Sequence, residues 1–272
     1  MLLGRNDGLF RGAIGQSGFG APLGRYPGGF NATQAMQATY DRFVGKVPSC
    51  ADLVVSGKSL PCLRKAPMSE ISSAILATTT TGREWAPVLD GDFFEDYTTN
   101  QLSNGNFVKV PILIGANTDE GVSFGAGRRL DGGNINTDED MRNALRNIIP
   151  PQVKDTAGKS VNELTDEVME LYPDDQRLGI PSLETWPHVI KPGDEYAERF
   201  GLQARRSNAL FGDFAMPYQR RRANKVWAKH DVPSYGYRFN IKPNGQPEHA
   251  GVAHFQEVSI FGQKSSGTYT DF

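Results

Sequence analysis

The sequence predicts an α/β protein with a doubly wound, mostly parallel sheet, and three observations support this fold class. Short apolar segments of strand length alternate with long segments whose apolar residues recur at helical spacing. The 272 residues suffice for one large domain or two small ones with a sizeable core. Strands separated by long helical excursions pair as parallel neighbours, because a short hairpin cannot join them.

The first predicted elements are a strand, two helices and a second strand. Residues 11–17 form a short strand that ends in glycine-rich sequence. A helix is predicted from about Thr33, because one of its faces carries the apolar residues Met36, Tyr40, Phe43, Val44 and Val47. A short helix is predicted over 69–77, and the strongly apolar segment 108–115 is a strand.

Helices dominate the rest of the chain. Thr137 and Ser160 each precede an acidic residue by three positions, which is the pattern of a capping box. Two apolar stripes that predict core contacts follow them, namely Met141, Leu145, Ile148, Ile149 and then Val161, Leu164, Val168, Leu171. Segments 194–214 and 217–230 continue the helical region, and 235–239 is the last predicted strand.

Composition and charge exclude several classes of protein. The net charge of −2 gives no electrostatic reason to expect nucleic acid or an anionic membrane as a partner. The basic run Arg220–Arg222 lies at helical spacing and predicts a solvated helix face. No stretch approaches the roughly 18 apolar residues of a membrane span. The N-terminal MLLGRNDGLF also lacks the apolar run of a signal peptide.

The two cysteines leave two interpretations open. Cys50 and Cys62 bracket eleven residues rich in turn formers, so that they form either a disulfide or two reduced, buried thiols. A bridge across a loop of this size stabilises the fold by about 3 kcal/mol. No second cysteine or histidine stands at metal-ligand spacing, so no metal site is expected. Asn31 begins a glycosylation sequon, which together with a disulfide would indicate an oxidising compartment.

Two predicted loops carry residues typical of a hydrolytic site. Sites in doubly wound sheets collect where parallel strands end. Glu120 follows the strand at 108–115, and His254 follows the strand at 235–239. In a triad, the histidine takes a proton from a nucleophile while the carboxylate orients the imidazole and stabilises its cation. The order acid then histidine matches that of α/β-hydrolases, whose serine precedes both.

The serine of such a triad is not evident in this sequence. Gly121–Gly125 has the letters G-x-S-x-G, but it lies five residues beyond its strand and no good helix follows it. A nucleophile elbow requires strand, turn and helix in immediate succession, so Ser123 is only a narrow alternative. Ser17 does end a strand, but it lacks the glycine two positions later.

Several motifs in order make the chain resemble one family. They are NDGLFRGAIGQSG, CADLVVSGKSLPCLRKAP, WAPVLDGDFF, VPILIGANTDEGVSF, LYPDD followed by LGIP, and GVAHFQEVSIFG. Together they resemble the carboxylesterase type-B family, the cholinesterase-like esterases and lipases, and in particular its fungal members. The resemblance covers essentially the whole chain and implies a partial α/β-hydrolase domain over residues 1–272.

The resemblance also assigns roles to individual residues. It implies that Glu120 is the triad acid and His254 the general base, while Asp119 is the neighbouring motif position and no triad member. Ser17 would orient Glu120 through its hydroxyl. The resemblance favours the disulfide Cys50–Cys62 and secretion, with glycosylation at Asn31.

The implied reaction is hydrolysis of a small-molecule or lipid carboxylic ester through an acyl-enzyme, without a metal or an organic cofactor. His188, His230 and His249 are expected to be structural or exposed, and Glu257 to help cap a local helix start.

The chain departs from the family at both ends. The family's N-terminal half, with its Gly-rich oxyanion loop and its G-x-S-x-G serine, has no counterpart here, and the chain stops soon after the His254 segment. We therefore expect a fragment that lacks its nucleophile and is inactive by itself. We also expect further strands to precede Arg11, so that their absence leaves an unpaired sheet edge. The alternative is a non-catalytic, cholinesterase-like binding protein, since one fold hosts many functions.

Overall fold

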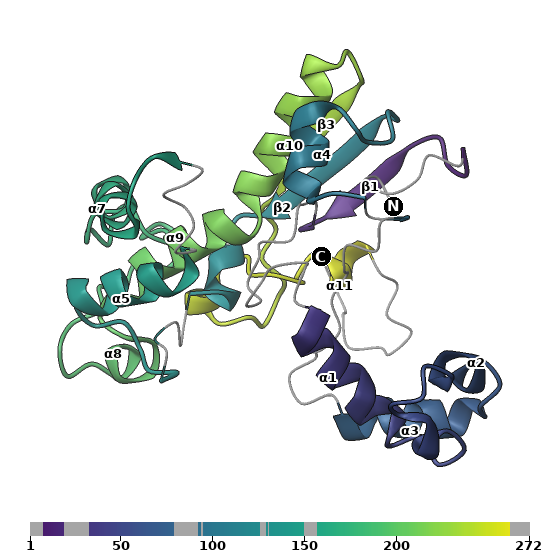
Figure 1. Cartoon of the computed structure of the whole chain (residues 1–272). Coiled ribbons are helices and arrows are strands. Elements are labelled where there is room, and N and C mark those ends of the chain that lie inside the picture. Colours follow the sequence, from purple (N-terminus) through teal and green to yellow (C-terminus); the bar gives the residue numbers. More distant parts are fainter. Residues whose placement is uncertain are drawn as a thin grey trace. The chain divides into compact units, whose positions relative to one another are not determined.

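The chain folds into two compact units in the computed structural model (Figure 1). One unit comprises residues 1–6 and 21–108, and the other comprises residues 7–20 and 109–272. The structure describes residues 8–18, 33–78, 92–93, 95–125, 129, 131–149 and 157–261. A single partial domain over 1–272 stays a prediction.

The first unit is helical. Its elements are α1 (Thr33–Val44), the 3₁₀ helix η2 (Ala51–Leu53), α2 (Ser59–Leu63), α3 (Met68–Thr78) and α4 (Thr98–Asn104). Three residues of the apolar face predicted for the first helix are buried, because Phe43, Val44 and Val47 pack with Cys50 and Ala74. The side chain of Met36, on the same predicted face, lies outside the described part of the chain. Tyr40 packs against the same cluster. The structure therefore confirms the first two predicted helices to within a few residues.

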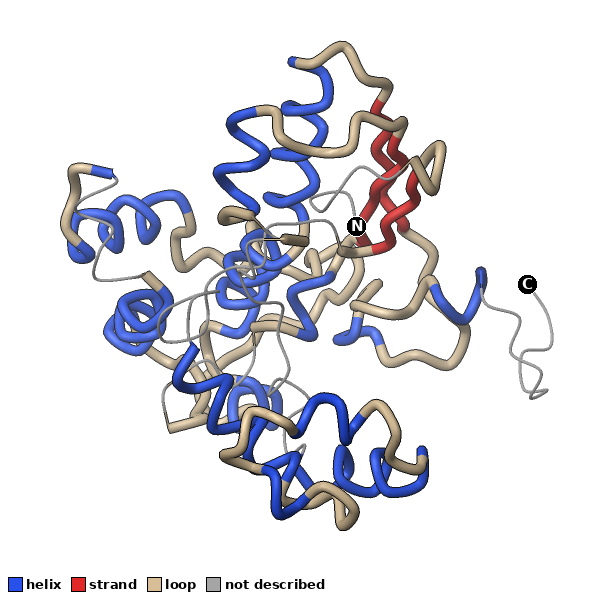
Figure 2. The backbone as a smooth tube through the Cα atoms, turned by 45° about the vertical axis from the view of Figure 1, so that its right-hand side comes forward, coloured by secondary structure: helices blue, strands red, loops and turns tan. Residues whose placement is uncertain are grey.

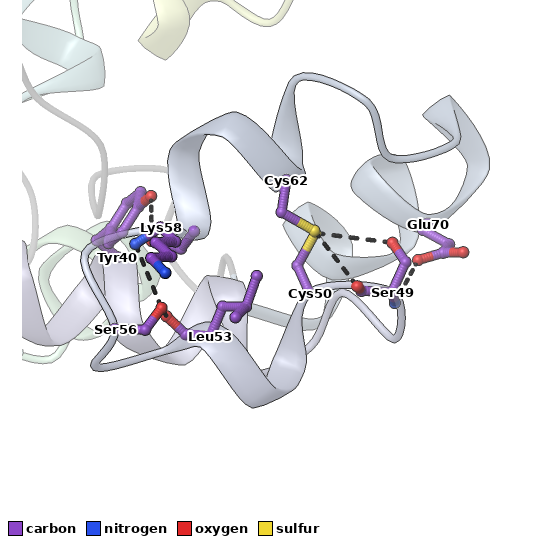
Figure 3. Close-up of a disulfide and its surroundings, with 9 residues drawn as sticks. Tyr40, Ser49, Cys50, Leu53, Ser56, Lys58, Cys62 and Glu70 are labelled. Atoms are coloured by element: carbon purple, nitrogen blue, oxygen red, sulfur yellow. Dashed lines mark hydrogen bonds between the residues drawn. A yellow bond between two sulfur atoms is a disulfide. The ribbon is translucent and has the colours of Figure 1, made fainter.

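A disulfide joins Cys50, directly before η2, to Cys62 in α2 and closes the loop between them (Figure 3). The two Cα atoms are 5.9 Å apart, which lies within the normal range for a bridge. The backbone N–H of Ser49 donates to Glu70 on α3, and the hydroxyls of Tyr40 and Ser59 are 2.9 Å apart. The loop is thereby fixed to α1 and α3, and the disulfide interpretation of the two cysteines is confirmed.

The second unit is built on a three-stranded parallel sheet (Figure 2). Its strands are β1 (Ala13–Gln16), β2 (Ile112–Asn117) and β3 (Ser234–Phe239), in the order β1-β2-β3. Ile14 pairs with Leu113, which in turn pairs with Tyr235. Both pairings are parallel, as the long helical excursions between the strands predicted.

Helix α10 (Pro217–Lys229) packs against this sheet. Trp227 is fully buried, and its indole Nε1–H donates to the carbonyl of Val110, 2.8 Å away. The expectation of a fully solvated basic run is wrong for Arg220, because its guanidinium donates to the carbonyl of Tyr237 in β3 at 2.6 Å. Arg221 is exposed, as predicted.

The remaining helices form a second core. They are α5 (Asp138–Ile148), α7 (Val161–Leu171), α8 (Glu195–Phe200) and α9 (Ala204–Ala215). Thr137 and Ser160 each cap their helix within a complete capping box, as predicted. The core between α5, α7 and α9 contains Ile135, Met141, Ala144, Leu145, Met169, Leu210 and Phe211. Leu171 was expected in this core, but it is 75% exposed because α7 ends there.

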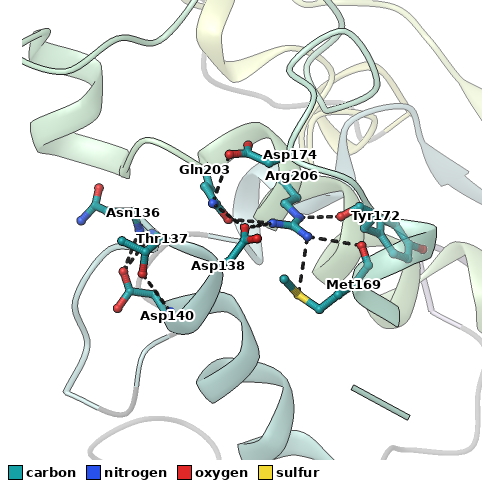
Figure 4. A network of polar contacts seen from close by, with 9 residues as sticks. All are labelled: Asn136, Thr137, Asp138, Asp140, Met169, Tyr172, Asp174, Gln203 and Arg206. Carbon is teal, nitrogen blue, oxygen red and sulfur yellow. Dashed lines mark hydrogen bonds and ion pairs between the residues drawn. The ribbon is translucent and has the colours of Figure 1, made fainter. Parts of the chain in front are cut away.

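Arg206 connects three of these helices (Figure 4). From α9, its guanidinium donates to Asp138 in the first turn of α5 at 2.6 Å. It also donates to the carbonyls of Met169 and Tyr172 at the end of α7, at 3.3 Å and 2.5 Å. The pKa of Asp138 lies below its usual value, because Gln203 and then Arg206 donate hydrogen bonds to it. This network holds α9, the helix against which the site described below packs.

Candidate active site

The carboxyl ends of β2 and β3 bring the two predicted loops together. The 3₁₀ helix η3 (Glu120–Ser123) begins three residues after β2 ends. After β3 comes a second 3₁₀ helix, η4 (Glu248–Ala250), followed directly by the segment that carries His254. Because the strands are parallel neighbours, their ends lie at one edge of the sheet.

Glu120 and His254 are in direct contact. The Nδ1 atom of His254 is 2.7 Å from Oε2 of Glu120. The carboxylate is 1% exposed, whereas the imidazole keeps partial access to solvent. The other oxygen, Oε1, accepts hydrogen bonds from the Asn117 backbone N–H at 2.7 Å and from the Ser17 hydroxyl. Three donors therefore fix this buried carboxylate.

The pair is electrostatically coupled. The hydrogen bond that the imidazole donates to Glu120 raises the pKa of His254 above its ordinary value, although burial of the imidazole opposes this shift. Since Glu120 accepts from Nδ1–H, the neutral imidazole has Nε2 as its proton acceptor. Among the residues that the structure describes, Nε2 has no hydrogen-bond partner. The imidazole can therefore take a proton at Nε2 and share the resulting charge with Glu120.

Ser17 reaches this carboxylate from the end of β1. Its backbone N–H donates to the carbonyl of Gly115 at 3.0 Å, and its φ of 52° is in the left-handed region. This turn directs the buried hydroxyl at Glu120. The contact is the one that the sequence resemblance led us to expect.

Asn117 and Glu257 belong to the same cluster, and neither was predicted there. The Asn117 side-chain amide donates to Glu257 Oε2 at 2.5 Å and to the carbonyl of Ala253 at 2.7 Å. Glu257 is 2% exposed and directly precedes α11 (Val258–Phe261), so its expected role at a local helix start stays a prediction. Burial raises the pKa of the nearby Tyr237, and the charges of Glu257 and Glu120 raise it further. No local motif marks these two residues, because the partners of their side chains are more than 100 positions away.

The G-x-S-x-G letters at 121–125 have a packing explanation. A Cβ atom on Gly121 would lie 1.7 Å from the backbone oxygen of Asn208 in α9. One on Gly125 would lie 2.1 Å from the Asn208 side-chain oxygen. The two glycines thus let η3 approach α9, while Ser123 between them is exposed and, in the described part of the chain, makes no hydrogen bond to His254. This geometry disfavours Ser123 as a nucleophile.

The other histidines lie apart from this pair. His188 contacts Asp194 through Nε2 at 2.5 Å and stacks on Trp186. His249 packs against Tyr196, and burial lowers its pKa. His230 ends helix α10. Their structural contacts match the expectation for His188 and His249.

The site and the fold define a class of protein before any comparison. A parallel sheet that presents a buried carboxylate after one strand, in contact with a histidine after the next, is the arrangement of an α/β-hydrolase. The comparisons agree. The chain belongs to the carboxylesterase family, a family of ester hydrolases, whose model matches residues 1–271.

Three similar proteins illustrate this membership. Neuroligin-2 of Homo sapiens is 25% identical over 271 residues, which cover 96% of this chain and 28% of that protein. Acetylcholinesterase of Electrophorus electricus is 27% identical over 218 residues, which cover 75% and 34% of the two chains. The crystal structure of Aspergillus niger EstA matches with a TM-score of 0.59 at 24% identity, over 99% of this chain and 46% of that one.

The last comparison shows the fold. The chain spans about a third or less of the two sequence relatives named here and about half of the structural one. Separately, no helix in the described ranges has the length and apolar character needed to cross a membrane.

Proposed function

We propose that this chain carries the acid and the base of a Ser–Glu–His carboxylic ester hydrolase, and that the serine lies in a polypeptide segment outside this sequence. The observation that carries the proposal is the contact between His254 Nδ1 and the buried Glu120 carboxylate at 2.7 Å. The carboxylate is held by further donors, and Nε2 is the nitrogen that would face the nucleophile. Family membership supports the same reaction class.

In the proposed mechanism, Nε2 of His254 accepts the proton of the serine hydroxyl as its oxygen attacks the ester carbonyl. Glu120 stabilises the imidazolium that forms. The imidazolium then protonates the leaving alcohol, which leaves an acyl-enzyme that water hydrolyses by the same proton transfers. Backbone N–H groups would stabilise the oxyanion by about 2.7–4 kcal/mol per donor. The substrate is a small-molecule or lipid ester, and no step requires a metal or an organic cofactor.

The test uses the longest natural polypeptide that contains this sequence, alongside the 272-residue chain itself. Both are assayed for hydrolysis of p-nitrophenyl esters and for labelling by a fluorophosphonate, which reacts with activated serines. We expect the longer polypeptide to hydrolyse esters, with H254Q and E120Q each lowering kcat on the order of 10⁴-fold. The 272-residue chain should take no label.

Ser123→Ala is the matched control, because Ser123 is exposed and close in sequence to Glu120. It should leave the activity of the longer polypeptide unchanged. Hydrolysis that survives both H254Q and E120Q would refute the assigned roles. Activity of the 272-residue chain that is abolished by S123A would instead make Ser123 the nucleophile.

The alternative is a non-catalytic binding protein of the same family. It is kept because neuroligin-2 matches nearly the whole chain, and its name, unlike that of acetylcholinesterase, states no ester hydrolysis. An activated serine nucleophile distinguishes the two functions, because only the ester hydrolase requires one. A longest natural polypeptide that takes no fluorophosphonate label and hydrolyses no ester would favour binding.

Secretion of the complete protein belongs to this proposal. The Cys50–Cys62 disulfide supports an oxidising compartment. The sequon asparagine, Asn31, lies outside the described residues. Treatment of the native protein with a peptide N-glycosidase should increase its gel mobility, and Asn31→Gln should remove that shift. A native protein with no glycan and reduced cysteines would contradict secretion.

A further inference from the structure

Asp119 holds the loop of His254 by two backbone hydrogen bonds. Its N–H donates to the carbonyl of Val252 at 2.9 Å, and its carboxylate Oδ2 accepts from the Val252 N–H at 2.7 Å. Asp119 is 1% exposed and Val252 is 4% exposed. Asp119, which directly precedes Glu120, therefore binds both the N–H and the carbonyl of Val252, two positions before His254.

Gly251 makes this close approach possible. Its φ of +55° lies in the left-handed region, and a Cβ atom there would be 2.4 Å from Oδ2 of Asp119. Any side chain at position 251 would therefore displace the carboxylate. The Asp119 carboxylate occupies space that is open only because residue 251 has no side chain.

A second contact lies on the next residue of the loop. Asn117 donates from its side chain to the carbonyl of Ala253 at 2.7 Å. Asn117, at the end of β2, and Asp119 thus hydrogen-bond to the backbone of both residues that directly precede His254, independently of the contact between Glu120 and the imidazole. The acid and the groups that hold the loop of its base therefore lie within the four residues 117–120.

The charges around the two side chains can be named. Burial raises the pKa of Asp119, whereas the Val252 N–H and the charges of Arg238 and Arg205 lower it. Arg205 is itself 1% exposed, and burial lowers its pKa to about 10. The carboxylates that face His254 are Glu120 and Glu257. Asp119 could therefore act by its charge or by the hydrogen bond that it accepts, and the two roles are separable by substitution.

We propose that Asp119 is a positioning residue that latches the Gly251–Val252 backbone and so presents the imidazole of His254 to Glu120. The latch acts through the hydrogen bond accepted by the side chain. It deepens the proposed function, because a base presented in this way is what that function needs. The latch itself can be tested without any hydrolytic activity.

The experiment measures His254 directly in the full chain. Diethyl pyrocarbonate acylates only neutral imidazole, so the rate of modification against pH, followed by mass spectrometry of the His254 peptide, gives the titration midpoint and the accessibility. The variants are D119A, which removes the acceptor, and D119N, whose amide oxygen can still accept from Val252. In D119A we expect the midpoint of His254 to fall and its modification to become faster. D119N should stay close to wild type.

Hydrogen exchange provides the second measurement. In the wild-type chain the Val252 amide should exchange slowly, and in D119A roughly tenfold faster, as the loss of one hydrogen bond implies. Thr137→Ala is the matched control, because it weakens the cap of α5 and destabilises the same unit without touching this loop. It should leave the His254 midpoint unchanged.

Three results would overturn the latch. One is a folded D119A, judged by circular dichroism, whose His254 titrates and reacts as in wild type. Another is D119N behaving as D119A, which would assign the effect to charge. The third is fast exchange of the Val252 amide in the wild-type chain, which needs no variant to fold. Failure of ester hydrolysis with an intact latch would instead count against the proposed function.

Discussion

At the scale of single residues, the contact between His254 and Glu120 makes the free energy of unfolding depend on pH. Because the pKa of folded His254 is raised above its ordinary value of 6.5, its contribution is fully present below that pH. The contribution is lost as the pH rises through the higher folded pKa. We expect E120Q to remove this loss, because the hydrogen bond to Glu120 is the main cause of the shift. Thermal unfolding of wild type and E120Q at several pH values between about 5.5 and 9 measures this loss of stability.

Comparing E120Q with wild type isolates the contribution of His254 to the pH dependence. His249 contributes with the opposite sign, because burial lowers its pKa and its contribution is lost at low pH. Glu139→Gln is the matched control, since it removes one exposed carboxylate that pairs with Arg146. It should leave the pH dependence unchanged. An E120Q chain with the pH dependence of wild type would contradict the coupling.

Ser17 contributes stability through the same carboxylate. Replacing it by alanine removes a hydrogen bond to a buried, charged acceptor, so we expect S17A to lower the free energy of unfolding by about 1.5–3 kcal/mol. Urea denaturation measures the change. Ser103→Ala, which removes an exposed hydroxyl on α4, should stay within about 0.5 kcal/mol of wild type. Equal effects of the two substitutions would rule out a special role for Ser17.

At the scale of secondary-structure elements, Arg206 stabilises the packing of α9 on α5 and α7. Its guanidinium satisfies two carbonyls and pairs with Asp138, while its own side chain is buried. We expect Arg206→Met to lower the free energy of unfolding by about 1.5–3 kcal/mol, because the carbonyls of Met169 and Tyr172 lose their donor. Denaturation in urea at neutral pH measures this change in the free energy of unfolding.

Arg142 provides the comparison for this prediction. It pairs with Asp166 at the surface, between α5 and α7, and exposed ion pairs contribute about 1 kcal/mol or less. Arg142→Met should therefore cost less than Arg206→Met. If the order is reversed, the buried network of Arg206 does not hold these helices together.

At the scale of the whole molecule, the sheet presents an apolar row. Ile14, Leu113 and Tyr235 are in register across the three strands and are 75%, 38% and 62% exposed. Among the described residues, β1 pairs only with β2. Surfaces of this kind bind other chains or hydrophobic probes. They agree with a chain that spans only part of its relatives' length.

We expect the 272-residue chain to bind anilinonaphthalene sulfonate or to be poorly soluble. Dye fluorescence should fall when Ile14 and Tyr235 are replaced by threonine. The control Val55→Thr changes a residue that is 93% exposed in the other unit and should leave the fluorescence unchanged. A monodisperse monomer that binds no dye and unfolds cooperatively would contradict the prediction.

Periodic and motif-bearing elements could be predicted from the sequence. The helix after Thr137 has both a capping signal and an apolar stripe, and the structure confirms both. The disulfide was recognised through its motif, whereas its spacing alone left two interpretations open. Leu171 shows the limit of periodicity, because a stripe does not say where a helix leaves its core.

The sequence by itself determined the fold class and the family, and it predicted Glu120 and His254 as acid and base, because these inferences depend on local periodicity and on motifs read in order. Only the tertiary structure decided that Glu257 is buried against Asn117 and that Asp119 holds Val252. It also decided that Gly121 and Gly125 serve the packing of η3 on α9. These contacts join residues some 80 to 140 positions apart, and no local pattern encodes which distant groups parallel strands bring to one edge.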